Sequence, residues 1–427
     1  MTSKTQPHPD GAGYILVTVL ILTSCASLLV FGMLNQSMSW MKIAARQEAL
    51  EGALFAADGG AQLCLAYIMA GNATPASITG TIGGATYRAG IVAGGDTAVL
   101  NYTLCSTGFM RGVRRIVTLD FVHSRSWAEY AMWYSASGVI YFQTGDRFRG
   151  KMHCNCPIYI TSGNSPVFES LLTCANPTWG QGPESAVFSN GFQLGVPAEN
   201  MSAINFTNTA STQDCLRLLA NLVLTGATTI GMSGTNFFIT NSKRGWTNLN
   251  YGITNKPLMT NGVLYVASAG TSTGDVTLAG TLDGRVTIVA EGNINITNHI
   301  RYTYNPTNSA STNNNDALGL ISRKDIIVKA NCPANLDIYA HLIAEGGLTA
   351  STSDGMFTVE NATTRSGCGN LNVYGGIVQN YRGTVGDTSG HGYLKNYWFD
   401  SRFSTNPPPR YPVIGDKYYC GGWRDAP

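Results

Sequence analysis

The sequence is poor in charge. Of its 427 residues, 27 are Lys or Arg and 25 are Asp or Glu, so only 12% are charged and the net charge is +2. No block of basic residues with interleaved aromatics occurs, so the composition argues against a nucleic-acid partner. The 25 acidic residues and six histidines are scattered, and their spacing reveals no catalytic pair or triad. We therefore expect no catalytic residue and no enzyme activity.

Metal-ligand motifs are equally sparse. The one dense cluster is His153-Cys154-Asn155-Cys156, and no second matching pair of Cys or His accompanies it. A structural zinc site needs paired ligands at defined spacings. The sequence therefore predicts no metal site and no cofactor.

One long uncharged run lies near the N-terminus. It covers residues 14–34, which as a helix is long enough to cross a bilayer core of ~30 Å. A secretory signal peptide would have a positively charged start and a shorter apolar core, whereas this leader carries only Lys4. Ser24-Cys25-Ala26-Ser27 leaves signal-peptide cleavage, or a lipoprotein-like cysteine, as the alternative to a membrane anchor.

The helical pattern continues past the apolar run to about residue 70. Glycine and proline then end it at Gly71 and Pro75. Because glycine weakens a helix, we expect a bend or partial melting at Gly59 and Gly60. Apolar residues recur at three- and four-residue steps and predict one buried helical face: Ile43, Leu50, Leu54, Ala57, Ala61, Leu65 and Ile68.

The segment RQEALEGALFAADGGAQLCLAYI resembles the N-terminal region of PilX-type pilus assembly proteins. The matching residues are Glu48-Ala49-Leu50, Ala56-Ala57-Asp58 and Gly60. The resemblance covers about the first 75 residues. It implies that a prepilin peptidase removes leader 1–13 between Gly13 and Tyr14, or cleaves after Gly11.

The same resemblance implies a single-pass inner-membrane protein with an exported C-terminal domain, which reaches the pilus or cell surface after assembly. Its partners would be the membrane, other pilin subunits and the pilus assembly machinery. Major pilins carry a glutamate at the fifth mature position, where this chain has Thr18, or Leu16 for the earlier cleavage site. This departure favours a minor subunit, joined to others through alanine-rich surfaces at residues 44–57.

The remainder predicts a mainly β structure, so the fold class is α+β. In 76–124 we expect strands at 87–92, 102–107 and 113–122, with Met110-Arg111-Gly112 as a hairpin turn. In 125–391 short apolar runs separated by Asn- and Gly-rich turns favour an irregular β-solenoid with an insertion at about 175–259. A β-sandwich is the alternative.

Phrases such as GTLDGRVTIVAEGNINIT and LNVYGGIVQNYRGTVG resemble an uncharacterised β-rich domain family found with PilX-type N-termini. That resemblance spans about 125–415. The last zone, 392–427, is rich in aromatic residues around Pro407-Pro408-Pro409. We interpret it as a cap over the end of the solenoid, with a platform for carbohydrate as the alternative.

The sequence contains 10 cysteines, and Cys25 lies in the apolar run. An exported domain is expected to form disulfides. The candidates are Cys154, Cys156, Cys174, Cys215, Cys332, Cys368 and Cys420.

Two functional hypotheses follow. The first is a membrane-anchored minor pilin-like subunit of a type IV pilus or related secretion pseudopilus. The second is a membrane-tethered solenoid enzyme or adhesin that acts on a surface polysaccharide.

Overall fold

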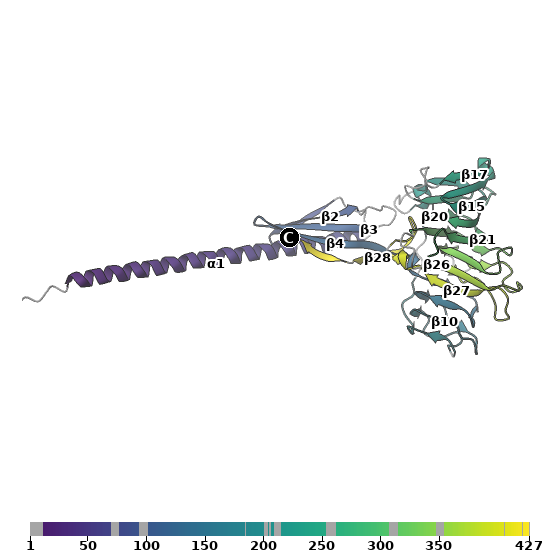
Figure 1. The fold of residues 1–427 in the computed structure, drawn as a ribbon, viewed down its shortest axis with the longest axis horizontal. Coiled ribbons are helices and arrows are strands. Elements are labelled where there is room, and N and C mark those ends of the chain that lie inside the picture. The colour runs from purple at the N-terminus through teal and green to yellow at the C-terminus, as the bar shows by residue number, and fades with distance from the viewer. Residues whose placement is uncertain are drawn as a thin grey trace, which may run out of the picture. The chain divides into compact units, whose positions relative to one another are not determined.

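The computed structural model describes residues 12–69, 77–93, 101–183, 185–199, 204, 206–208, 215–252, 262–306, 315–346, 354–404, 406–420 and 422–426. One long helix is followed by a mainly β structure (Figure 1), so the predicted α+β class is confirmed. The chain divides into two compact units. Unit 1 is Met1–Ala93, Tyr102–Val122 and Cys420–Pro427, and unit 2 is Gly94–Asn101 and His123–Tyr419.

Helix α1 (Ala12–Met69) is continuous for 58 residues. It would be ~87 Å long at the usual rise per residue. The predicted melting at Gly59 and Gly60 is wrong, because the helix continues through both residues. A Cβ atom would lie 2.5 Å from Ile82 at Gly59 and 2.5 Å from Tyr87 at Gly60, so these glycines make room for the sheet instead.

The strands of unit 1 belong to a six-stranded sheet, and α1 packs against β1 and β2 of this sheet. Its order is β1-β2-β3-β4-β28, and β29 also pairs with β4. The predicted hairpin is confirmed: Arg111 and Gly112 both have positive φ, 47° and 76°, as a tight turn between two strands requires. The bounds are β1 (Ile78–Ile82), β2 (Ala85–Ala93), β3 (Asn101–Met110), β4 (Val113–Ser126), β28 (Val413–Cys420) and β29 (Trp423–Ala426).

The C-terminal half of α1 buries its small residues. The predicted buried face is confirmed in part, since Ala57 and Ala61 are fully buried. Leu50 and Leu54 are only half-buried, and Ile43 is exposed. A helix approaches a sheet most closely along a face of small side chains, and this contact is close: a Cβ atom at Gly108 of β3 would lie 1.9 Å from the carbonyl oxygen of Ala53. The fully buried set is Ala49, Ala53, Ala56, Ala57, Ala61 and Cys64.

This contact predicts that Gly108→Ala destabilises unit 1. The added methyl group must displace the α1 backbone, and overpacking of this kind costs about 1–3 kcal/mol. Hydrogen exchange of the β3 amides should accelerate. Gly231→Ala is the matched control, since a Cβ atom there lies 3.8 Å from its nearest neighbour. Unchanged protection of β3 in Gly108→Ala would contradict this packing.

Unit 2 consists of short strands that pair mainly in parallel. The exceptions are β15, β16 and β17, which form an antiparallel meander. The bounds are β5 (Met132–Ala136), β6 (Tyr141–Phe142), β7 (Arg147–Arg149), β8 (Met152–Cys154), β9 (Tyr159–Ile160), β10 (Val167–Phe168), β11 (Leu172–Cys174), β12 (Val187–Phe188), β13 (Phe192–Leu194), β14 (Leu222–Thr225), β15 (Thr228–Gly234), β16 (Asn236–Asn241), β17 (Trp246–Gly252), β18 (Val263–Ala267), β19 (Val276–Leu282), β20 (Arg285–Ala290), β21 (Ile294–Tyr302), β22 (Ala317–Ser322), β23 (Ile326–Val328), β24 (Leu336–Ala344), β25 (Phe357–Val359), β26 (Asn370–Tyr381) and β27 (Leu394–Phe399). Short helical turns are η1 (Trp127–Glu129), α2 (Leu216–Leu219), η2 (Ser242–Arg244) and η4 (Ser401–Ser404).

The parallel strands stay in register from one end of unit 2 to the other. One row of paired side chains passes through ten strands, and its members belong to the interior core except at the two ends, where Leu222 is half-buried and Phe192 is exposed. Its members, in spatial order, are Leu222, Leu264, Ile288, Leu320, Leu342, Ile377, Met132, Met152, Leu172 and Phe192.

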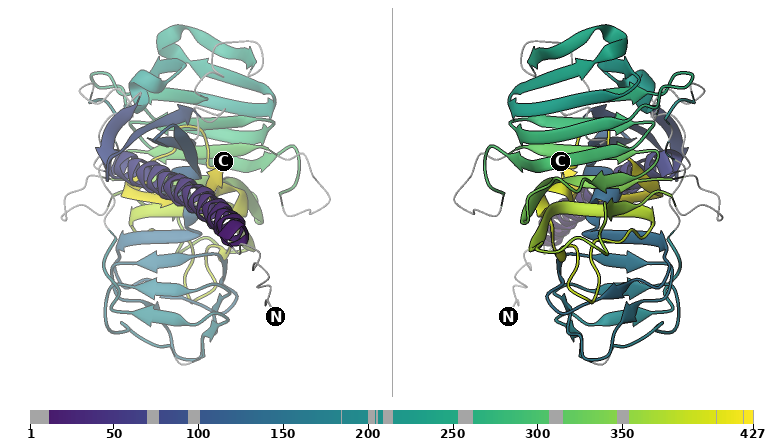
Figure 2. Two further views of the ribbon diagram at one scale, coloured as in Figure 1. Left: turned by 90° about the vertical axis from the view of Figure 1, so that its left-hand side faces the viewer. Right: turned by 90° about the vertical axis from the view of Figure 1, so that its right-hand side faces the viewer.

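The chain does not follow this spatial order. It begins in the middle at β5, proceeds through β8 and β11 to β13 at one end, and resumes at β14 at the other end. It then returns strand by strand until β26 pairs with β5 and β27 with β7. Figure 2 shows the result: the blue strands form one end, the teal and green strands form the other, and the yellow-green strands lie between them.

The structure therefore revises the expected domain limits. The predicted insertion at 175–259 contains β12 to β15, which belong to the parallel ladders. The predicted cap at 392–427 does not act as one unit, since β27 is a ladder strand whereas β28 and β29 pair in the six-stranded sheet.

Several ladder strands are buried on both faces, which is usual for parallel sheets. Their outward side chains, such as Tyr265 of β18 and Trp133 of β5, form a second core. Segments from elsewhere in unit 2 cover it through Trp127, Phe206, Leu216, Phe403 and Tyr411.

Glu345 anchors one of these covering segments. Its Oε1 accepts a hydrogen bond from the backbone N–H of Ile204 at 2.6 Å, and the residue is buried. Burial raises the pKa of Glu345 to about 7, against the opposing effects of the Ile204 N–H and of Arg323. The folded protein therefore holds a proton that the unfolded chain releases near pH 4.5.

The stability of the folded protein should therefore depend on pH through Glu345. Below pH ~4.5 the carboxyl is protonated in both states. Between pH ~4.5 and ~7 only the unfolded chain gives up the proton, so the free energy of unfolding falls with rising pH, by roughly 3 kcal/mol in all. Glu345→Gln should lack this loss. Denaturation of both proteins across this range checks it, and a pH-independent difference between them would contradict it.

Candidate functional site

The N-terminal half of α1 is one candidate functional surface. Every side chain from residue 14 to residue 48 is exposed. Among the described residues, α1 is one helix long and apolar enough to cross a membrane, and its most apolar window has no side chain buried. This supports membrane anchoring through α1.

Several hydroxyl side chains in this half form hydrogen bonds within the helix. Thr18 donates a hydrogen bond to the carbonyl oxygen of Tyr14 at 2.7 Å, and Ser27 donates to that of Thr23 at 2.7 Å. A hydroxyl bonded to its own helix needs no partner in lipid or on another helix. The Thr18 hydroxyl therefore has a partner within α1 itself.

The predicted cleavage site lies at the start of α1. The helix begins at Ala12, so Gly13 and Tyr14 lie in its first turn, and the Tyr14 side chain is exposed. Gly11 lies outside the described residues. Cleavage between Gly13 and Tyr14 remains a prediction.

Most of the alanines that were predicted to contact other subunits are buried within unit 1 instead. Ala49, Ala53, Ala56 and Ala57 pack within unit 1, and of the predicted group only Ala44 and Ala45 are exposed. The large apolar side chains that α1 exposes among the described residues beyond residue 48 are Phe55, Leu63 and Tyr67.

The predicted disulfides are not present among the described cysteines, which are all free thiols: Cys25, Cys64, Cys105, Cys154, Cys156, Cys174, Cys215, Cys332 and Cys368. The side chain of Cys420 lies outside what the structure describes. Several thiols donate instead to backbone carbonyls, as Cys174 does to Cys156 and Cys332 to Ile296.

Cys154 and Cys174 occupy paired positions on β8 and β11 and are both buried. Burial raises the pKa of the Cys154 thiol well above its usual value, and it raises that of Cys156 to about 12. The thiolate is the reactive form of cysteine, so Cys154 and Cys156 are held unreactive, whereas a hydrogen bond with Cys154 lowers the pKa of Cys174. His153 does not add a metal site here, because its ring bonds Thr173 and Asn155. Among the described residues no three His, Cys, Asp or Glu side chains gather in a metal-binding group.

This arrangement predicts the order of thiol alkylation in the folded protein. Iodoacetamide should modify the half-buried Cys368 well before the buried Cys154 and Cys174. Unfolding in denaturant should make all three react at similar rates. Mass spectrometry of digests checks this, and a Cys154–Cys174 disulfide found without added oxidant would contradict the free thiols.

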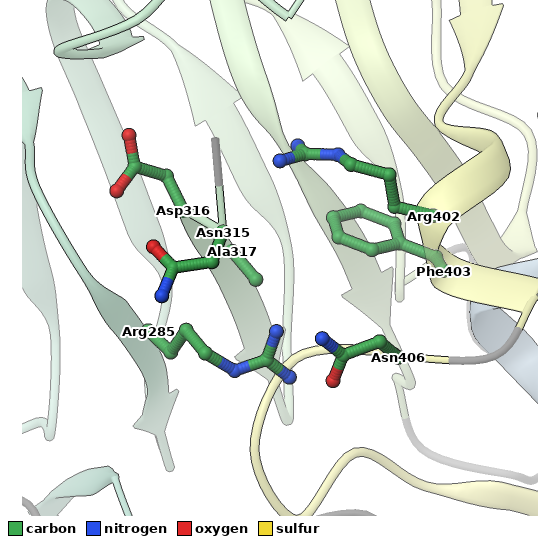
Figure 3. A pocket seen from close by; sticks show the side chains of 7 residues that line it. All are labelled: Arg285, Asn315, Asp316, Ala317, Arg402, Phe403 and Asn406. Carbon is green, nitrogen blue, oxygen red and sulfur yellow. The ribbon is translucent and has the colours of Figure 1, made fainter. Parts of the chain in front are cut away.

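A second candidate site is a pocket of about 270 Å³ in unit 2 (Figure 3). Arg285 of β20 and residues 315–317 at the start of β22 form one side, and residues from η4 onwards form the other. The lining residues are Arg285, Asn315, Asp316, Ala317, Arg402, Phe403 and Asn406.

The charged groups of this pocket are held in place by the protein. Arg402 bonds both carboxylate oxygens of the fully buried Asp400 and is 29% exposed. Arg285 donates to the carbonyl oxygen of Pro407 at 2.6 Å. Asp316 accepts from the N–H of Gly284 at 2.7 Å, and burial raises the pKa of its carboxyl.

Sequence reasoning missed this pocket. Its residues come from 285, 315–317 and 402–406, and no motif connects these segments. Only the pairing of β20 with β22 and the return of the chain after β27 bring them together.

No family model matches the chain. No curated protein matches it. Among solved structures it is similar to the competence-associated pilin ComZ from Thermus thermophilus, with 14% sequence identity and a TM-score of 0.31, over 88% of this chain and 97% of that one.

Proposed function

We propose that this chain is a minor, pilin-like structural subunit of a type IV pilus or a related secretion pseudopilus, with a PilX-type N-terminus. Before assembly, α1 anchors it in the inner membrane in a single pass, and both units are exported. After assembly, α1 packs among the helices of other pilin subunits, and unit 2 is displayed at the surface. The proposal assigns unit 2 a display role rather than a catalytic one.

The observation that carries the proposal is the difference between the two halves of α1, one of which is packed against a sheet and the other exposed. Its C-terminal half is held by the sheet of unit 1 through small residues, while every side chain from residue 14 to residue 48 is exposed, and Glu48 at the end of this stretch pairs with Arg111. An apolar helix of this length exposed on one protein needs lipid or other helices around it. A helix that moves from a bilayer into a filament core meets both environments in turn.

The parallel ladders of unit 2 support the further proposal that it is a β-solenoid. Ten strands stay in one register, and each strand contacts mainly the next. Such a stack is rigid and elongates by repetition, which suits a displayed element.

The proposal predicts processing at the N-terminus. In cells with a prepilin peptidase, N-terminal sequencing of the membrane-bound protein should begin at Tyr14. Without the peptidase it should begin at Met1. A start after Ala26 would instead indicate ordinary signal-peptide cleavage and would contradict the proposal.

The exposed apolar side chains on the C-terminal half of α1 predict a test of assembly. Phe55 is 71% exposed, so Phe55→Ser should leave the fold of unit 1 intact but sharply reduce the amount of protein in purified filaments. Glu51→Ser, an exposed position one turn earlier, is the matched control and should assemble normally. Immunoblots of filament and membrane fractions measure both, and equal incorporation of the two variants would count against helix packing through Phe55.

A further inference from the structure

We propose that the end of unit 2 formed by β12 and β13 binds the same end of a second copy of this chain. A two-fold axis relates the two copies, and each ladder of one copy continues into a ladder of the other. The inference concerns unit 2 by itself and does not depend on filament assembly.

The two edge strands at this end each pair on one side only among the described strands. β12 pairs with β10, and β13 pairs with β11. Val187 and Ser189 donate backbone hydrogen bonds toward β10, at 2.9 Å each. Because backbone groups alternate in direction along a strand, the N–H of Phe188 between them points to the open side. This end of unit 2 therefore offers backbone groups to a further strand.

The side chains at the same end form an aromatic and apolar surface. Trp179, Phe188 and Phe192 lie with ring centroids between 5.0 and 5.7 Å apart. Phe192 is 41% exposed and Val187 is 48% exposed. Large apolar side chains gathered in this way are typical of the centre of a protein–protein interface.

The opposite end of unit 2 is protected against such pairing, whereas the β12–β13 end is not. At the opposite end, β17 pairs with β16 across a register shift, and Asn248 has a positive φ of 50°. The exposed Lys243 and Arg244 lie in the turn between these two strands. Irregular pairing and charge discourage an edge strand from adding another molecule. Residues 185–198 contain no charged residue, so the β12–β13 end lacks this protection by charge.

A second copy matches this end in both geometry and charge. β12 and β13 end two separate ladders, and they are only two and three residues long. A single added strand would pair with one of them over a few residues. The same end of another copy presents two edge strands at the same spacing and is equally uncharged. A two-fold axis brings this patch against itself and closes the assembly at two copies.

Photo-crosslinking of the full chain in detergent micelles tests the proposal. A photoreactive residue replaces Gln193, an exposed position on β13, in a mixture of unlabelled and isotope-labelled protein. We expect adducts that join the two isotopic forms and map to residues 185–198 of the second copy. Adducts that map elsewhere, or no adducts between the two forms, would overturn the proposal. Adducts to a different protein in place of a second copy, in purified filaments, would also overturn it.

Variants assign the contact to this end. Val187→Lys places like charges against each other across the two-fold axis and should reduce the adducts about tenfold or more. Ser189→Lys adds the same charge at an exposed position without removing an apolar group, and it should have the same effect. Val139→Lys is the matched control, because Val139 is 61% exposed and lies outside this end, and it should crosslink normally. Equal crosslinking in all three variants would overturn the assignment.

Discussion

The close approach of strand β3 to helix α1 is the contact on which unit 1 depends. The absence of a side chain at Gly108 lets β3 reach the backbone of Ala53, and a row of alanines keeps the helix against the sheet. The small residues face inward, so the large apolar residues of α1 are left outside. One face of α1 therefore packs against the sheet, and Phe55 on another face remains exposed.

Unit 2 obeys a different constraint, which is the continuous register of parallel strands. Backbone hydrogen bonds and a single inward row of side chains connect its two ends. Because the chain starts in the middle of the stack, the unit is closed only when β26 and β27 pair with β5 and β7. The same return of the chain brings η4 to β20 and β22, so the pocket forms only when the stack is closed.

Local patterns in the sequence predicted the helix, the hairpin at Arg111 and Gly112, and short strands such as Ile326–Val328. They did not predict the features that depend on packing between residues distant in the sequence. The buried face of α1 was predicted only in part: Ala57 and Ala61 are buried, but apolar periodicity also favours Leu50 and Leu54, which are half-buried. The order of the ladders depends on pairing between distant segments, which no local signal encodes. One usable signal was overlooked: Phe148, Phe168 and Phe188 recur every 20 residues and stack in the structure.

The central claim is that the exposed half of α1 contacts the helices of other pilin subunits in a filament. Photo-crosslinking from Leu22 and Phe31 tests it most directly, with Gln193 of the displayed unit as the reference position. All three side chains are exposed in the isolated protein. The account predicts that filaments yield adducts to other pilin subunits from Leu22 and Phe31 and none to pilin helices from Gln193. Filaments without the chain, or adducts to pilin helices only from Gln193, would contradict it.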